Sequence, residues 1–296
     1  MEEKNSIEEL VTKQLQEDTT TPASPEVATT DQDMSVNTMY QETKLPSLGR
    51  QIFSVVKMEG PTAALFNVLK DDSTTKFKIL RNEVQVYPSK SINTGLTQEV
   101  VQDIRSQFGK SAIRMVGTLL RGLSNEAENI KTLEFLEAKS KAEPTLTLTD
   151  ETNSETTLFE ITNKVNTLVL KANSKNMRTY EAFCVLPYSA GSSISALNKY
   201  VGGKNKDERG LFIAEVGQIK FYMNPDATST KAYVGLKDSD NISKSSAVFG
   251  PYVSEIVEAQ DPESGNMNYF IFNRFSITES PLHRTGNEML FKFDIA

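Results

Sequence analysis

The chain has 296 residues, 38% of them hydrophobic, and a formal net charge of −7. This length suits one large domain or two of ordinary size, and the acidic balance argues against a basic nucleic-acid-binding surface. One cysteine and one histidine, Cys184 and His283, exclude an intrachain disulfide and a zinc site of Cys and His ligands. No apolar run approaches the ~18 residues of a membrane helix, and the first residues lack the basic and apolar regions of a signal peptide.

The negative charge is concentrated at the start of the chain. Residues 1–43 carry a net charge of −8, which leaves +1 for the remainder, and a nearly neutral body self-associates readily. Residues 6–16 have helical spacing, with Ser6 and Glu9 as a capping box. Residues 18–38 are rich in Thr, Ser, Pro, Asp and Gln and predict a flexible linker. Two interpretations of this arm stay open, a disordered tail or a removable, scaffold-binding segment.

The ordered body is predicted to begin near Leu45 and to include a two-stranded arm over residues 60–87. A polar tip at residues 71–75 separates the strands, and the second strand alternates apolar and polar residues from Phe77 to Val86. An isolated hairpin is marginal in water. We therefore expect this arm to gain order by lying on something else, such as another subunit.

A long amphipathic helix is predicted over residues 111–139. Its apolar residues recur three or four positions apart and form one stripe: Ile113, Val116, Leu120, Leu123, Ala127, Ile130, Leu133 and Leu136. Leu120 lies in the middle of the stripe and should be buried. Gly117 and Gly122, and a possible capping box at Asn125 and Glu128, leave open a break into two helices, although one helix is favoured.

The remaining elements are shorter. Helices are predicted at residues 96–108, at 158–172 with Thr157 and Glu160 as a capping box, and at 192–201. Strands are predicted at 145–149, at 183–186 with Cys184 as a core thiol, and at 291–295. A strand at 219–223 is predicted to turn at 224–226 and return as a strand at 231–236, and a strand at 256–257 to turn at 261–266 and return at 268–278. The aromatics Tyr269, Phe270, Phe272 and Phe275 are interpreted as sheet core. The fold class is α+β.

No catalytic pattern stands out in the sequence. The dinucleotide and P-loop glycine patterns are absent, and Ser189–Ser193 lacks a nucleophile elbow. Asp238 and Asp240 lack the Gly and Glu of a calcium loop, and His283 lies in a predicted loop. We therefore expect no enzyme and no catalytic, cofactor-binding or metal-binding residues, with an enzyme of unrecognised site as an alternative.

Several short motifs follow one another in a fixed order. They are Gly60–Phe66; Phe77–Ile79 with Thr97–Gly109; Gly217–Tyr222; and Tyr233–Lys237 with Gly250–Val253 and Asp261–Pro262. In this order and spacing they resemble the major capsid proteins of T-even-type tailed bacteriophages, across residues 45–282. The likeness implies the tailed-phage capsid fold, which encapsulin shells share. The extended loop lacks the family's inserted domain, the N-terminal arm does not match clearly, and residues 283–296 have no counterpart.

The likeness also implies how the chain is divided. The parts are a flexible acidic arm and possible propeptide at 1–44, an N-arm at 45–59, an extended loop (E-loop) at 60–90, a peripheral domain at 91–182 with the spine helix at 111–139, an axial domain at 183–250, and a return to the peripheral domain with a C-terminal strand at 251–296. Charged residues of the N-arm and extended loop are the candidate inter-subunit contacts. These are Arg50, Lys78, Arg81 and Glu83.

By the same likeness, the chain is a structural subunit that self-assembles into hexamers, and into pentamers where the shell requires them, of an icosahedral phage head enclosing double-stranded DNA. Vertex, scaffold, decoration and portal proteins and non-specifically held DNA are the further partners implied. The protein would belong to the virion and assemble in the host bacterial cytoplasm. The alternative is a related vertex protein that forms only pentamers. A carbohydrate-binding or adhesion module is a rival, against which the absence of Trp and of the inserted domain argues.

The acidic arm holds candidate sites of proteolytic processing. Capsid proteins of this family are cut after Leu-x-Glu or Ile-x-Glu, which Leu15–Glu17 and Ile7–Glu9 match, as do four segments of the body. Because a protease needs a flexible segment, we predict cleavage after Glu17 and a mature chain that starts at Asp18. Mass spectrometry of the chain from mature particles tests this, and an intact Met1 end would reject it.

Overall fold

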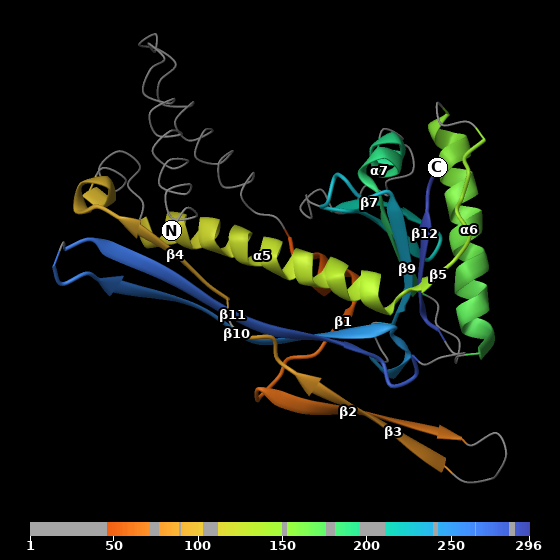
Figure 1. The fold of residues 1–296 in the computed structure, drawn as a ribbon, viewed down its shortest axis with the longest axis horizontal. Coiled ribbons are helices and arrows are strands. Elements are labelled where there is room, and N and C mark those ends of the chain that lie inside the picture. Colours follow the sequence, from red (N-terminus) through yellow and green to blue (C-terminus); the bar gives the residue numbers. More distant parts are fainter. Residues whose placement is uncertain are drawn as a thin grey trace. The chain divides into compact units, whose positions relative to one another are not determined.

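The structure of the chain, a computed structural model, describes residues 46–70, 77–88, 90–102, 112–149, 153–175, 181–195, 211–238, 242–263, 265–283 and 288–296 (Figure 1). The helices are α3 (Leu48–Ile52), α5 (Ala112–Lys139), α6 (Ser154–Lys175), α7 (Tyr188–Ser195) and the 3-10 helix η1 (Ile242–Lys244), and residues 98–102 are also helical. The strands are β1 (Ser54–Val55), β2 (Thr62–Lys70), β3 (Phe77–Gln85), β4 (Lys90–Leu96), β5 (Lys141–Ala142), β6 (Glu181–Leu186), β7 (Phe212–Val216), β8 (Ile219–Met223), β9 (Lys231–Lys237), β10 (Ala247–Gln260), β11 (Met267–Glu279) and β12 (Leu290–Asp294). The mixed order of helices and strands confirms the α+β class.

The described residues fall into two compact units. The first contains Pro88–Glu126 and Val253–Arg274, and the second contains Pro46–Tyr87, Ala127–Tyr252 and Phe275–Ala296. Helix α5 and strands β10 and β11 have residues in both units. Among the described residues, no helix combines the length and the apolar character that crossing a lipid bilayer requires.

The first unit packs the beginning of α5 on a sheet. Strand β4 pairs antiparallel with β11, and β10 is the neighbour of β11 on its other side. Val116 and Leu120 of α5 share one buried cluster with Tyr269 and Ile271 of β11. A Cβ atom at Gly117 would lie 3.1 Å from Cδ1 of Ile256, so this glycine lets the helix lie close to β10.

Helix α5 confirms the predicted long helix. It runs without interruption through Gly117, Gly122 and Asn125, so the alternative of two helices is wrong. The restart signal at Asn125 and Glu128 was misread because both residues lie within the helix, where Glu128 is fully buried. Leu120 is 1% exposed, as predicted.

The second unit contains a six-stranded sheet in the order β5-β12-β9-β6-β8-β7. The predicted strands at 219–223 and 231–236 are confirmed as β8 and β9, but they do not pair with each other as a hairpin. Strand β6 lies between them, parallel to β8 and antiparallel to β9. Every residue from Ala182 to Leu186 is buried, and a strand that is apolar on both faces is stable in the middle of a sheet.

The two faces of this sheet are covered by different helices. Ala182, Cys184 and Leu186 belong to the cluster with α6 and α7, whereas Phe183 and Val185 belong to the cluster with α3 and the end of α5. Figure 1 shows α6 along one face of this sheet. Burial raises the pKa of the Cys184 thiol, which confirms this residue as a core thiol. Gly235 is paired with Phe183, and a Cβ atom there would lie 2.8 Å from Cδ2 of Leu290.

Helix α6 begins earlier than its pattern predicted. The side chain of Asn153 caps it, because Oδ1 accepts hydrogen bonds from the backbone N–H groups of Glu155 at 3.0 Å and Thr156 at 3.3 Å. The predicted capping box is therefore wrong. Thr157 is buried in the first turn, and Glu160 accepts a hydrogen bond from the backbone N–H of Thr149 instead.

Other boundaries differ as well. The predicted strand at 145–149 is reduced to one parallel bridge, Leu146 with Ile295. Helix α7 starts at Tyr188, directly after Pro187, and residues 196–201 of the predicted helix lie outside the described residues. The predicted helix at 96–108 is seen at 98–102, and residues 103–108 also lie outside the description. The predicted β10–β11 hairpin and the last strand, β12, are confirmed.

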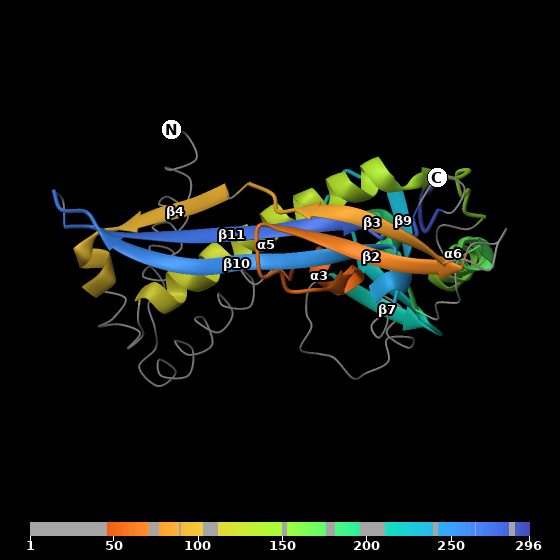
Figure 2. The ribbon, with the colours of Figure 1, turned by 90° about the horizontal axis from the view of Figure 1, so that it is seen from below.

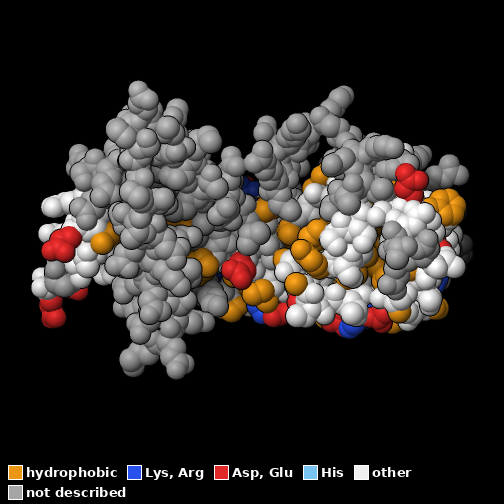
Figure 3. All heavy atoms as spheres, turned by 90° about the horizontal axis from the view of Figure 1, so that it is seen from above, with side chains coloured by type: hydrophobic (Ala, Val, Ile, Leu, Met, Phe, Trp, Pro, Cys, Tyr) orange, Lys and Arg blue, Asp and Glu red, His pale blue; other side chains and the backbone are white. Residues whose placement is uncertain are grey.

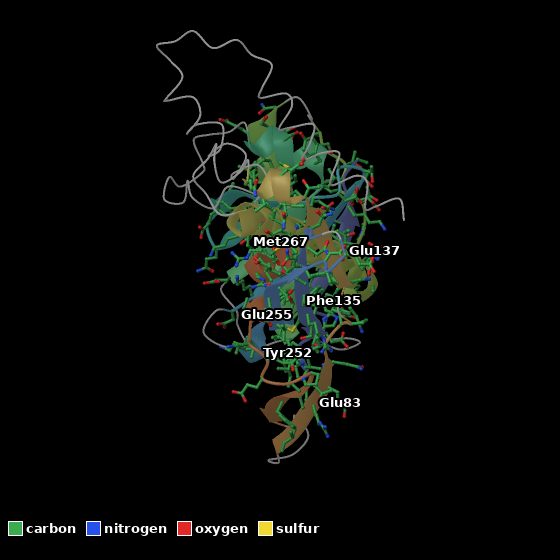
Figure 4. All side chains as sticks on the ribbon, turned by 90° about the vertical axis from the view of Figure 1, so that its left-hand side faces the viewer. Glu83, Phe135, Glu137, Tyr252, Glu255 and Met267 are labelled. Carbon is green, nitrogen blue, oxygen red and sulfur yellow. The ribbon has the colours of Figure 1, made fainter. Side chains whose placement is uncertain are left out.

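A single carboxylate ties the end of α5 to the sheet. Oε1 of Glu137 accepts from Nζ of Lys231 at 2.7 Å and Nζ of Lys292 at 2.8 Å, and Oε2 accepts from the hydroxyl of Tyr233 at 3.0 Å. Burial raises the pKa of Glu137, but the hydrogen bonds from Lys231, Lys292 and Tyr233 outweigh it and lower the pKa from 4.5 to about 2. Figure 4 labels Glu137 beside Phe135 of the same helix.

This carboxylate gives a pH-dependent prediction. Because the folded-state pKa of Glu137 is depressed, its contribution to stability is present above about pH 4.5 and is lost as the pH falls toward 2. Glu137→Gln should therefore lower the melting temperature at neutral pH, and the difference from wild type should shrink on acidification. Thermal melting of both proteins across this range tests it. Glu134→Gln, which alters an exposed pair with Lys131, is the control and should cost little at any pH.

Candidate assembly surface

Strands β2 and β3 form an antiparallel hairpin, as predicted (Figure 2). Its register pairs Thr62 with Gln85 and Lys70 with Phe77, and the tip at 71–76 lies outside the described residues. Alternate residues of a strand point to opposite faces. The hairpin therefore has an inner and an outer face, which differ in burial.

The inner face rests on the hairpin's own chain. Leu80 is 4% exposed and belongs to the cluster of α6 and the six-stranded sheet. Val84 and Val86 pack with Met58 and Tyr252. The side-chain amide of Asn82 donates a hydrogen bond to the carbonyl oxygen of Glu279 at 3.0 Å. The arm therefore lies on something else, as expected, but on this face the support is the body of its own chain and not another subunit.

The outer face carries exposed apolar and charged side chains. Phe66 is 62% exposed and Ile79 67% exposed. The guanidinium of Arg81 lies 5.9 Å from the centroid of the Phe66 ring and 3.3 Å from the carboxylate of Glu83. An ion pair this exposed contributes little to stability. Exposed apolar residues with charges beside them are typical of protein-binding surfaces.

The structure separates the predicted contact residues. Arg81 and Glu83 lie together on this outer face, where Figure 4 labels Glu83 on the hairpin. The backbone of Lys78 pairs with Leu69 in the same hairpin, and its side chain is outside the description. Arg50 lies in α3, and Glu17 is not among the described residues.

Arg50 has a role within its own chain. Its Nη2 lies 2.9 Å from Oε1 of Glu128, its Nε donates to Oε2 at 3.1 Å, and its guanidinium lies 5.3 Å from the centroid of the Phe249 ring. The side chain of Glu128 is fully buried, whereas that of Arg50 is 40% exposed. A fork-to-fork pair of this kind holds both side chains in one geometry.

Asn129 and Thr132, two residues of α5 close to Glu128, contact other parts of α3 and the residues before it. Oδ1 of Asn129 accepts from the backbone N–H of Leu48 at 2.6 Å, and its amide donates to the carbonyl oxygen of Pro46 at 3.2 Å. A Cβ atom at Gly49 would lie 2.7 Å from Oγ1 of Thr132, so glycine is needed for this approach. This attachment could not be predicted from the sequence. Helix α5 also buries the polar residues Ser124 and Thr132, and no local pattern indicates that Glu128 and Asn129 are buried.

A second exposed apolar face lies on the sheet of the first unit. Tyr269 and Phe275 are buried, as predicted, but Phe272 is 38% exposed and Val257 39% exposed. The rings of Phe270 and Phe272 stack with centroids 6.4 Å apart. The prediction that all four aromatics are core is wrong, because residues at even positions of β11 face away from α5. Figure 3 shows another face of the molecule, where hydrophobic side chains also reach the surface among acidic ones.

Within the described residues, no group of three or more His, Cys, Asp and Glu side chains could hold a metal ion. His283 is packed rather than exposed. Its Nδ1 accepts a hydrogen bond from the backbone N–H of Met289 at 3.0 Å, and burial lowers its pKa. The exposed faces described above are the candidate functional features.

Neither the known family models nor the curated proteins include a match to this sequence. Solved structures match it in fold. A chain of Mycobacterium phage Bobi gives a TM-score of 0.54 at 10% identity and covers 86% of this chain and 91% of that one. The virus-like particle from Pyrococcus furiosus gives 0.53 at 12% identity, with coverages of 88% and 98%. The capsid structure of the cyanophage P-SCSP1u gives 0.50 at 9% identity, with coverages of 82% and 86%.

These identities are low, so the likeness is one of fold. The chain has the α+β fold of tailed-phage capsid structures over most of its length, as the sequence resemblance led us to expect. The matched structures come from several phages and a virus-like particle, and none of those named above singles out the T-even type.

The Arg50–Glu128 pair gives a testable distinction between two roles. Arg50→Ala should lower the free energy of unfolding by roughly 3 kcal/mol, because it leaves a buried carboxylate without the guanidinium. Arg50→Lys should fall between this variant and wild type, because an ammonium cannot form the fork. Denaturant unfolding of the unassembled chain measures both. Unchanged stability with lost assembly would instead make Arg50 an inter-subunit contact.

Proposed function

We propose that this chain is the structural subunit of an icosahedral bacteriophage head. It assembles with copies of itself into hexamers, and into pentamers where the shell requires them, which enclose double-stranded DNA. The observation that carries the proposal is the capsid fold over 82–88% of the chain in structures such as the cyanophage capsid and the virus-like particle. The exposed apolar faces described above supply surfaces for self-association.

Two of these faces suit each other across a subunit boundary. The outer face of the hairpin offers Phe66 and Ile79 beside a charge pair, and the sheet of the first unit offers Phe272 and Val257 beside the exposed Glu255. Apolar side chains at the centre of a contact with charges at its edge are usual in interfaces. In the proposed shell, the hairpin of one copy therefore packs on the β10–β11 sheet of another. Repetition of this contact around a ring closes the capsomer.

The likeness to capsid proteins is also the basis on which we assign the parts of a capsid subunit. Residues 45–59 serve as the N-arm, 60–90 as the extended loop and α5 as the spine helix. The packing of α6 and β12 with the six-stranded sheet supports a larger axial domain than the 183–250 expected from sequence, one that also takes in residues 140–180 and 288–296. The peripheral domain then consists of the first unit, with β10 and β11.

The narrower assignments follow from the sequence resemblance. A T-even-type major capsid protein is the proposed identity within the fold, and a vertex protein that forms only pentamers is the second candidate. Vertex, scaffold, decoration and portal proteins are proposed partners, with assembly in the host bacterial cytoplasm before residence in the virion. Electron microscopy of the purified protein separates the two candidates, because hexameric rings or tubes favour the first and pentamers alone favour the second. A persistent monomer would reject both.

The role of the hairpin is tested by separating folding from assembly. Arg81 is 59% exposed, so Arg81→Glu should change the free energy of unfolding by no more than about 0.5 kcal/mol. It should still impair assembly, because a second carboxylate beside Glu83 would lie on the surface proposed to meet Glu255 of another copy. Leu120→Ala, in the buried cluster of the first unit, should cost roughly 2–5 kcal/mol through lost burial and a cavity.

Both variants are melted as unassembled subunits, and particle yield is measured in parallel by sedimentation. The expected result is a normal melting temperature with a low yield for Arg81→Glu, and a low melting temperature for Leu120→Ala. Normal assembly of Arg81→Glu, or a melting temperature as low as that of Leu120→Ala, would show that the hairpin is not the inter-subunit arm.

A further inference from the structure

Helix α6 has an outward face that the described part of its chain does not cover. Phe159 is 67% exposed and Leu170 is 69% exposed, which are, with Ile79 at 67%, the three highest values among the large hydrophobic side chains of the described residues. Asn163 and Asn166, which lie between them in sequence, are also exposed. The opposite side of α6 buries Leu158, Ile161, Val165 and Leu168 on the six-stranded sheet.

The four exposed residues form one straight row. They are spaced by four, three and four positions, so they lie within an arc of roughly 60° on an α-helix. This is the a/d spacing of the seam of a coiled coil, with Phe and Leu at the ends and two Asn in the middle. A seam with this spacing can pack against another helix, because its side chains can project as knobs into the holes between side chains of a partner helix.

The charged residues of α6 near this seam are engaged with their own chain. Lys171 pairs with Glu143, and Glu160 accepts a hydrogen bond from Thr149. Nζ of Lys164 lies 5.8 Å from the centroid of the Phe293 ring. The seam itself carries no charge from Phe159 to Leu170. An uncharged seam sets no like charges against each other when two copies of the chain meet there.

We propose that α6 pairs with α6 of a second copy of this chain, antiparallel and around a two-fold axis. The midpoint of the row lies between Asn163 and Asn166. An antiparallel partner centred there sets Phe159 against Leu170 of the other copy at both ends. Asn163 then faces Asn166 of the other copy, and each amide both donates and accepts a hydrogen bond. The row is therefore complementary to itself, as a two-fold contact requires.

The buried Asn pairs also explain the choice of register. A shift of the helices by one turn would set an Asn amide against Phe159 or Leu170, which leaves polar groups unsatisfied. One helix face is smaller than a standard stable interface. The pairing is consequently expected at high protein concentration, between free subunits. It does not depend on the proposed shell, whose formation is measured separately as particle yield.

Cysteine cross-linking tests the geometry directly. The one native cysteine, Cys184, is buried and does not compete. In the proposed pairing, Phe159→Cys combined with Leu170→Cys places two thiols opposite each other at each end, and oxidation should give a covalent dimer on a non-reducing gel. Either single substitution should remain monomeric, because equal positions lie roughly 16 Å apart along the axis, beyond disulfide reach. Cross-linking of a single variant would indicate a parallel pair and overturn the proposal.

A charge-pattern test uses variants that leave the fold intact, since both end residues are two-thirds exposed. Phe159→Glu with Leu170→Glu sets like charges opposite each other and should weaken self-association at least tenfold in sedimentation equilibrium. Phe159→Lys with Leu170→Glu sets opposite charges together and should restore it. Ile130→Ala, which trims an exposed apolar side chain of α5, is the control and should associate like wild type. A monomeric wild type, or equal association of both double variants, would overturn the proposal.

Discussion

The structure of the second unit depends on one constraint, which is that the sheet must be covered on both faces. Strand β6 is apolar at every position from Ala182 to Leu186, so neither face of it can meet water. Helices α6 and α7 cover one face, and α3 with the end of α5 covers the other. The long helix is thus a structural part of the sheet's core as well as of the first unit.

Polar contacts then fix the positions of α3 and the end of α5, which apolar packing alone leaves adjustable. Glu137 gathers Lys231, Lys292 and Tyr233 at the end of α5, and Asn129 with Glu128 attaches α3 roughly two turns earlier. Such contacts are directional, whereas the burial of Leu or Phe side chains tolerates small shifts. These contacts therefore give α3 and the end of α5 one defined geometry.

The periodicity of each strand and helix determines which of its side chains are exposed at the surface. A strand exposes every second residue and a helix every third or fourth, so a hairpin with one buried face presents an outer face with Phe66 and Ile79. Helix α6 in the same way presents Phe159 and Leu170 once its inner side is buried. Because these apolar side chains are largely exposed, association between copies is the physical use that both proposals give them.

The sequence by itself determined the elements whose signal is local. The period of α5, the two strands of the β2–β3 hairpin, the burial of Cys184 and the α+β class could all be predicted, because hydrophobic spacing reports which face of an element is buried. Of the candidate contacts, Arg81 and Glu83 were correctly placed on the hairpin. Only the tertiary structure decided that β6 separates β8 from β9, that the hairpin's inner face rests on its own chain, and that Arg50 pairs with Glu128. These are contacts between residues far apart in sequence, and no local pattern specifies which of several suitable apolar faces or charges will meet.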